Sequence, residues 1–180
     1  DKILKRMGRR TTRAQLTEII EKLRREIPDI VLRTTLITGF PGETEADHQE
    51  LMDFVDQMEF DRLGAFTYSP EEGTPAEKMT DQVPEELKEE RRDEIMELQQ
   101  EISLEKGNDR IGQELMVMIE GKVSGESAYI ARTYGDAPKV DGYLFVQTGE
   151  LLMTGDFAKV KVTGALEYDL IGELADEYTE

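Results

Sequence analysis

The chain has 180 residues, enough for one large domain or two small ones, and a formal net charge of −18. It has no cysteine and one histidine, which excludes disulfides and cysteine-ligated metals or clusters within these residues and nearly excludes serine–histidine catalysis. It also has no run of 18 apolar residues and no secretory signal pattern, so we expect a cytoplasmic location and no membrane partner.

The first 30 residues predict a basic, helical segment, with nine Lys/Arg against five Asp/Glu. Residues 1–7 read as the middle of a helix, and we therefore expect the chain to be a fragment. Thr12 and Gln15 then have the spacing of a capping box. Apolar residues follow at helical intervals, and Pro28 should end that helix (Leu16, Ile19, Ile20, Leu23, Ile27).

Two predicted strands joined through a helix come next. Residues 30–38 are rich in β-branched residues and apolar on both faces apart from Arg33, as expected of a buried parallel strand. Residues 62–67 form the second strand, and Thr44 can cap a helix between the two. Such a strand–helix–strand unit should be parallel and right-handed.

The loops that follow these strands are the most informative feature of the sequence. Residues 39–44 read Gly-Phe-Pro-Gly-Glu-Thr, and residues 68–76 read Tyr-Ser-Pro-Glu-Glu-Gly-Thr-Pro-Ala. In parallel α/β folds, ligands bind at the carboxyl ends of the strands. The two loops are therefore predicted to face one site and to belong to an enzyme.

A change of period divides the chain into two predicted domains, residues 1–109 and 110–180. A long charged helix over 84–106 ends near Gly107, and its run 85–94 is typical of a solvated face. Short strands separated by Gly and Asp turns then predict a small closed or partly open barrel of OB-like size (115–119, 128–131, 143–146, 157–162, 168–171).

The predicted barrel is acidic, with six Lys/Arg and 13 Asp/Glu in residues 110–180. Nucleic-acid binders normally show a basic face, because phosphate neutralisation supplies most of their affinity. The charge favours a basic protein partner, although an acidic surface can also serve solubility alone.

Strand-Gly-Phe-Pro-Gly-Glu-Thr, helix, strand-Tyr-Ser-Pro-Glu-Glu-Gly-Thr-Pro-Ala, helix and small barrel together resemble the radical S-adenosylmethionine (SAM) methylthiotransferases over about residues 2–175. The resemblance implies an α/β part, the last strands and helices of a partial TIM-like radical SAM barrel. It implies an all-β, OB-like TRAM domain after it.

Three segments resemble the branch of this family that methylthiolates the β-carbon of an aspartate in a small-subunit ribosomal protein, number twelve (32–35, 69–73, 134–142). The resemblance implies that this basic protein docks on the acidic TRAM domain, with nucleic acid not the main partner. The sibling branch, which methylthiolates adenosine in tRNA, is the alternative. A non-enzymatic substrate-docking module is a further one.

The resemblance also implies the cofactors and the position of the site. The full enzymes use SAM and two [4Fe-4S] clusters whose cysteine ligands lie outside this chain, so these residues alone should be inactive. No catalytic residue or metal ligand is assigned. The residues that it places beside the cofactor lie on the strands and in the loops after them: Arg33, Thr35, Ile37, Gly39, Phe40, Gly42, Tyr68 and Ser69.

Several of these residues have a plain structural alternative. Gly39 and Gly42 also suit a strand-to-helix turn, and Tyr68 suits a half-buried aromatic position. Glu43 and Thr44 suit the positive end of the following helix.

Arg33 is the most open case, because a guanidinium in an apolar strand needs a partner. It could hold the amino-acid end of the cofactor or the substrate aspartate, or form an internal salt bridge, for instance with Glu43. His48 is expected to lie on a charged helix face without a role.

Overall fold

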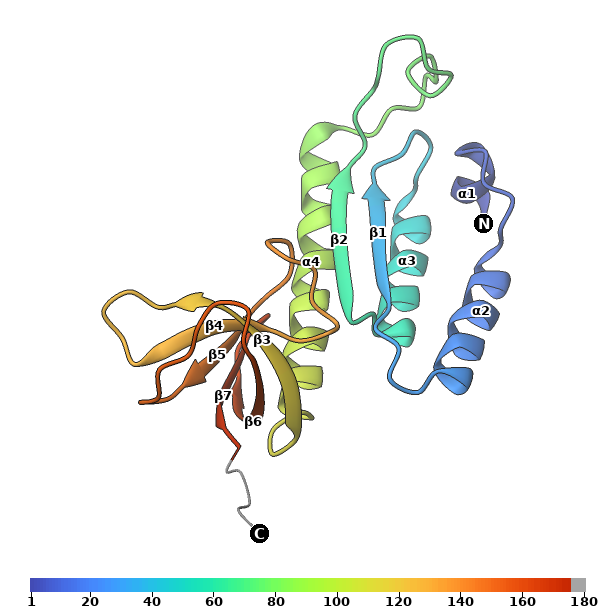
Figure 1. Ribbon diagram of the computed structural model, residues 1–180. Coiled ribbons are helices and arrows are strands. Elements are labelled where there is room, and N and C mark those ends of the chain that lie inside the picture. Colours follow the sequence, from blue (N-terminus) through green and yellow to red (C-terminus); the bar gives the residue numbers. More distant parts are fainter. Residues whose placement is uncertain (176–180) are drawn as a thin grey trace. The chain divides into compact units, whose positions relative to one another are not determined.

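The computed structural model describes residues 1–175, which divide after Ile102 into two compact units (Figure 1). The division falls inside a helix. None of the helices in the described part of the chain is long and apolar enough to cross a membrane.

The first unit is a strand–helix–strand unit with helices before and after it. Its elements are α1 (Lys2–Arg6), α2 (Arg13–Glu26), β1 (Arg33–Thr38), α3 (Glu45–Met58), β2 (Arg62–Thr67) and the start of α4 (Glu85–Asn108). β1 and β2 pair in parallel, in a register that sets Ile37 beside Phe66. The predicted parallel pair and the capping box of Thr12 with Gln15 are confirmed.

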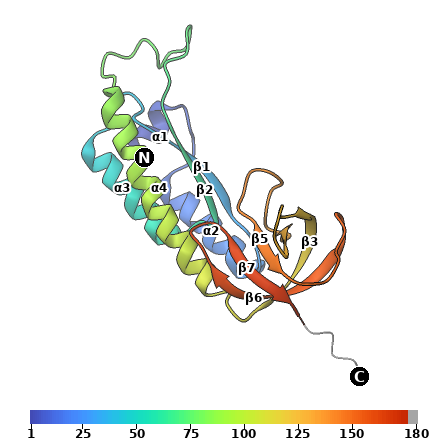
Figure 2. The ribbon, with the colours of Figure 1, turned by 90° about the vertical axis from the view of Figure 1, so that its left-hand side faces the viewer.

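The expectation that the first strand is buried on both faces is wrong. Thr34, Leu36 and Thr38 face the helices and are at least partly buried, whereas Arg33, Thr35 and Ile37 are exposed. Because successive side chains of a strand point to opposite faces, helices on one side cover only one set. Figure 2 shows α3 and α4 on the same side of the two strands.

The core of the first unit lies toward the amino ends of the strands. Ile20 of α2 packs with Phe54 and Met58 of α3 and with Phe60, and Leu63 of β2 lies against them. This cluster ties α2 and α3 to the sheet, so the carboxyl ends of both strands are left to the loops.

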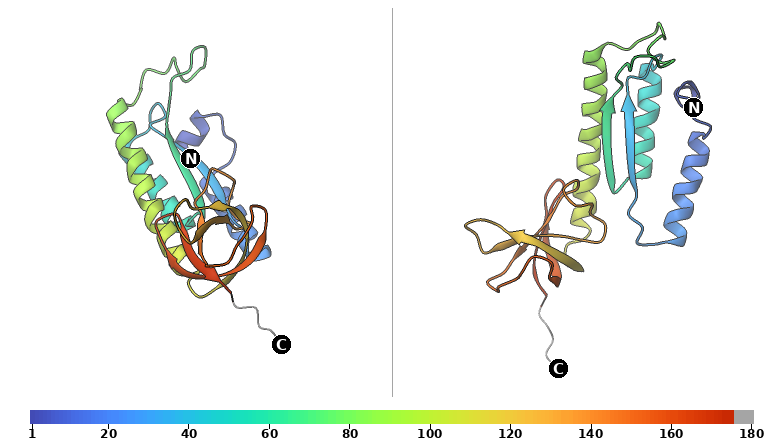
Figure 3. Two further views of the ribbon diagram at one scale, coloured as in Figure 1. Left: turned by 60° about the vertical axis from the view of Figure 1, so that its left-hand side comes forward. Right: turned by 45° about the horizontal axis from the view of Figure 1, so that its top comes forward.

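The second unit is a closed five-stranded barrel, as predicted. Its strands are β3 (Glu114–Lys122), β4 (Ala128–Arg132), β5 (Leu144–Gln147), β6 (Phe157–Ala165) and β7 (Leu170–Leu174), in the order β3-β4-β5-β7-β6. Figure 3 shows the ring of strands in its left view. Inward-facing residues alternate with exposed ones, and Val117, Ile119, Val160 and Val162 are among those that fill the interior.

Asp47 gives the first unit a pH dependence in acid. Partial burial opposes its ionisation, but hydrogen bonds from Lys2 and Thr44 outweigh that effect and lower its pKa from 3.8 to about 2. A carboxyl whose pKa is lower in the folded state stabilises that state above its unfolded pKa. We therefore expect part of the stability of this unit to be lost as the pH falls from about 4 to about 2.

NMR titration of the Asp47 carboxyl, with urea unfolding at several pH values, would test this expectation. Asp47→Asn should remove that part of the pH dependence. The matched control is Asp56→Asn, at an exposed position on the same helix. An Asp47 that titrates near 3.8 would contradict the prediction.

Candidate functional site

The two loops that follow β1 and β2 meet, as their positions in the sequence predict. The ring of Phe40 meets the ring of Tyr68 edge to face, with 5.2 Å between centroids. Farther along, the Gly42 N–H donates to the carbonyl of Asp81 at 2.8 Å. The carboxyl ends of both strands are therefore closed by one continuous set of contacts.

The first loop is a tight turn whose glycines are required. Pro41 and Gly42 occupy its two central positions, and the Glu43 N–H donates to the carbonyl of Phe40 at 2.9 Å. Gly42 has φ +81° and Gly39 has φ +71°, a backbone region that side chains with Cβ rarely adopt. The structural alternative for these glycines is thus correct, and it leaves a ligand role open.

The predicted cofactor residues fall into two groups. Arg33, Thr35 and Ile37 share the exposed face of β1, where Ile37 is 40% exposed. Gly39, Phe40, Gly42 and Tyr68 lie in the two loops and are buried or nearly so, whereas Ser69 is exposed. The structure thus has one exposed strand face, and at its end lie two loops that contact each other.

Phe66 of β2 is a part of this face that the sequence analysis missed. It lies beside Ile37 in the parallel register and is 61% exposed. Gly64, two residues earlier on the same strand, keeps the neighbouring position free of a side chain. Alternation along β2 combined with the register of β1 is the signal that could have found Phe66.

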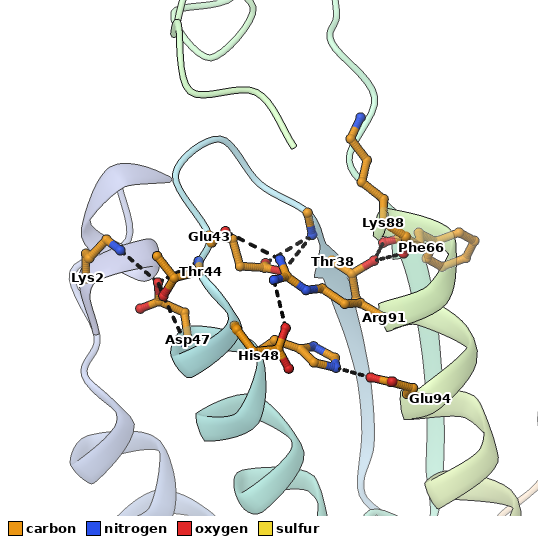
Figure 4. A network of polar contacts seen from close by, with 12 residues as sticks. Lys2, Thr38, Glu43, Thr44, Asp47, His48, Phe66, Lys88, Arg91 and Glu94 are labelled. Carbon is orange, nitrogen blue, oxygen red and sulfur yellow. Dashed lines mark hydrogen bonds and ion pairs between the residues drawn. The ribbon is translucent and has the colours of Figure 1, made fainter. Parts of the chain in front are cut away.

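Lys88 and Arg91 of α4 were also missed, because the run 85–94 reads as a solvated face. Both side chains are buried, and this part of the prediction is wrong. Lys88 donates from Nζ to the carbonyl of Tyr68 at 2.9 Å. Arg91 donates from Nη1 to Glu43 Oε1 at 2.9 Å, a contact that Figure 4 shows. The signal was their spacing, since they lie seven and four residues before the buried Ile95.

Glu43 accordingly does not cap the helix, and its carboxylate pairs with Arg91. Thr44 is the N-cap of α3, as expected, and forms a capping box with Asp47. The Glu43 carboxylate accepts the Gly39 N–H at 3.0 Å on each oxygen. Of the partners considered for Arg33, Glu43 is therefore already engaged in a buried ion pair.

His48 is buried, with a side chain that is 2% exposed. The expectation that it lies on a charged helix face is therefore wrong. Its Nε2 lies 2.7 Å from Glu94 Oε2. The reason is that α3 turns His48 toward α4 and not toward solvent. Within residues 1–175, no group of three or more His, Asp or Glu side chains is placed to hold a metal ion.

The exposed strand face offers apolar and polar side chains next to one another. Ile37 and Phe66 form an exposed apolar pair for a flat ring, and Thr35 and Arg33 continue the same face with polar groups. The Tyr68 hydroxyl is buried and has no hydrogen-bond partner among the described residues.

Comparison with known proteins finds a family-model match in each part of the chain. Residues 1–55 match the family model of the Radical SAM superfamily, and residues 111–175 match that of the TRAM domain. The chain is 58% identical over 172 residues to a "Ribosomal protein uS12 methylthiotransferase RimO" of Lachnoclostridium phytofermentans, and the match covers 96% of this chain and 39% of that protein.

Proteins of the same name from Pelotomaculum thermopropionicum and Desulfitobacterium hafniense are 52% and 50% identical to this chain. These matches cover 96% and 97% of this chain and 39% of each relative. The chain thus spans about two fifths of the length of the curated relatives it matches.

Proposed function

Because this chain belongs to the radical SAM methylthiotransferases, we propose that its strand face and loops form one wall of a SAM site in an enzyme that methylthiolates a ribosomal protein. The observation that carries the proposal is the open apolar pair of Ile37 and Phe66 beside the two closed loops. The iron–sulfur ligands would come from residues outside this chain, which has no cysteine.

In this proposal each part of the wall binds one part of the cofactor. Ile37 and Phe66 pack against the adenine, and Thr35 lies beside the ribose. Arg33 pairs with the carboxylate of the amino-acid end, for which a guanidinium has matching geometry. Gly39, Phe40, Gly42, Tyr68 and Ser69 close the end of the site and exclude water from it.

SAM and the clusters would supply the radical and sulfur chemistry, and the residues of this chain would bind and orient. We propose that the full protein contains two [4Fe-4S] clusters. We also propose that these 180 residues alone neither cleave SAM nor transfer sulfur.

Phe66→Ala should weaken binding of S-adenosylhomocysteine, an unreactive analogue, to the full-length protein by about tenfold, because it removes an aromatic ring from the adenine. Thermal stability should change little, since the ring is 61% exposed. Calorimetric titration and a melting curve measure the two quantities. Phe157→Ala, at a phenylalanine of the barrel that is 72% exposed, is the matched control. Unchanged affinity in Phe66→Ala would contradict the adenine assignment.

We propose that the substrate is the basic ribosomal protein named for the relatives, and that it docks on the TRAM barrel. The acidic balance of residues 110–180 supports this choice over tRNA. Work on a ribosomal protein would take place in the cytoplasm, which is the location we propose.

Removing three exposed carboxylates from the barrel should weaken binding of the ribosomal protein to the full-length enzyme about fivefold or more, because interface charges contribute up to about 1 kcal/mol each. Fluorescence anisotropy with the ribosomal protein and with tRNA measures this. The barrel variant changes Glu126, Glu150 and Glu167 to Gln. A control variant with the same change in net charge alters Glu18, Glu21 and Glu89 of the first unit.

The two variants separate location from overall charge. If both weaken binding equally, only net charge matters and docking on the barrel is wrong. If the protein binds tRNA more tightly and selectively than the ribosomal protein, the tRNA-modifying alternative replaces this proposal.

A further inference from the structure

The turn after β1 is held from behind by buried side chains of α4. Gly39 directs its N–H at the carboxylate of Glu43, and Arg91 holds that carboxylate from the helix. The side chains of Arg91 and Glu43 are 3% and 4% exposed. The backbone of Gly39 is thus linked to α4 through two charge-assisted contacts in series.

This link constrains the backbone at a position where glycine itself allows many conformations. Gly39 has φ +71°, and glycine adopts many conformations at similar energy. Arg91 adds a contact from Nη2 to Glu45 at 3.2 Å and so reaches the first turn of α3 as well. Without the guanidinium, the Glu43 carboxylate would be a buried charge without a cation. Moving it toward water would then lower the free energy.

Lys88, one helical turn earlier on α4, holds the second loop in the same way. Its Nζ donates to the carbonyl of Tyr68, and its own carbonyl accepts from the Thr38 hydroxyl at 3.0 Å. Its aliphatic stem fills the space where a Cβ on Gly39 would lie. A single turn of α4 therefore contacts the chain at the carboxyl ends of both strands. Figure 4 shows its contacts with Thr38 and Glu43.

We infer that Lys88 and Arg91 are positioning residues for SAM, an inference that rests on the function proposed above. They lie on the buried side of the sheet, behind the exposed strand face. They act through Tyr68 and Glu43 and hold both loops in their ligand-binding form before the ligand arrives. Pre-organisation of this kind raises affinity because the ligand does not have to order the loops.

A purely structural role makes a different prediction. Loss of stability lowers the fraction of folded molecules and leaves the affinity of each folded molecule unchanged. Loss of positioning lowers the affinity of molecules that are fully folded. Binding measured well below the melting temperature separates the two roles.

The experiment uses the full-length protein with its clusters reconstituted, and S-adenosylhomocysteine as the probe in calorimetric titration. Arg91→Met should weaken binding about tenfold, the equivalent of about 1.4 kcal/mol, with unchanged iron content. Arg92→Met, which removes the neighbouring and more exposed arginine, should bind as the wild type does. The double variant Glu43→Gln, Arg91→Met removes the unpaired charge, so it should fold well and still bind about tenfold more weakly.

If the double variant binds like the wild type, the positioning role is wrong, whether or not Arg91→Met folds. That result would leave the proposed function intact. Wild-type protein that does not bind the probe would instead overturn the proposed function itself.

Discussion

Arg91→Met should lower the free energy of unfolding of the first unit by about 3–5 kcal/mol, because it leaves the buried carboxylate of Glu43 without its cation. Both side chains are almost fully excluded from solvent. The Gly39 N–H contacts would remain, but one N–H donor does not replace a guanidinium. Urea unfolding followed by circular dichroism measures the loss.

The double variant Glu43→Gln, Arg91→Met should recover most of that stability, because it buries no net charge. Replacing a buried ion pair by neutral groups of similar volume is often nearly neutral. Arg92→Met is the control, and it should change stability by less than about 1 kcal/mol because its pair with Asp93 is accessible to solvent, with side chains 36% and 61% exposed. If Arg91→Met is as stable as the wild type, the Glu43 carboxylate in that variant must reach water or take up a proton.

The elements that the sequence predicts correctly are those that short-range patterns determine. Thr12 with Gln15 forms a capping box within one turn. The alternation of residues 157–162 and the glycine turns around them identify a barrel strand that is now seen as β6. The pairing of β1 with β2 follows from their connection through one helix.

The missed features all depend on contacts between distant parts of the chain. Glu43 and Arg91 are 48 residues apart, and His48 and Glu94 are 46 apart. A charged run such as 85–94 looks solvated by composition. The spacing of Lys88 and Arg91 from Ile95 suggests the buried side of the helix, but only the contacts with Tyr68 and Glu43 show how two cations are accommodated there. The open face of β1 was missed for a similar reason, since composition alone does not show which elements cover a strand.

Ile119→Ala should destabilise the barrel by about 2–5 kcal/mol, because it removes three carbon atoms from a core that has little room to collapse. Ile119 is fully buried and belongs to the hydrophobic cluster that fills the interior of the barrel. Hydrogen exchange of peptides from β3 and β6 measures the loss within the barrel itself. Met116→Ala, at a position of β3 that is 56% exposed, is the matched control and should have a small effect.

The two units allow this variant to separate docking from cofactor binding. Core contacts of the barrel involve residues 115–174, whereas the proposed SAM wall uses residues 33–69. At a temperature that unfolds the Ile119→Ala barrel, the full-length protein should no longer bind the ribosomal protein and should still bind S-adenosylhomocysteine. Loss of both activities would mean that the first unit needs a folded barrel to form its site. Retention of both would mean that the ribosomal protein is recognised outside the TRAM barrel.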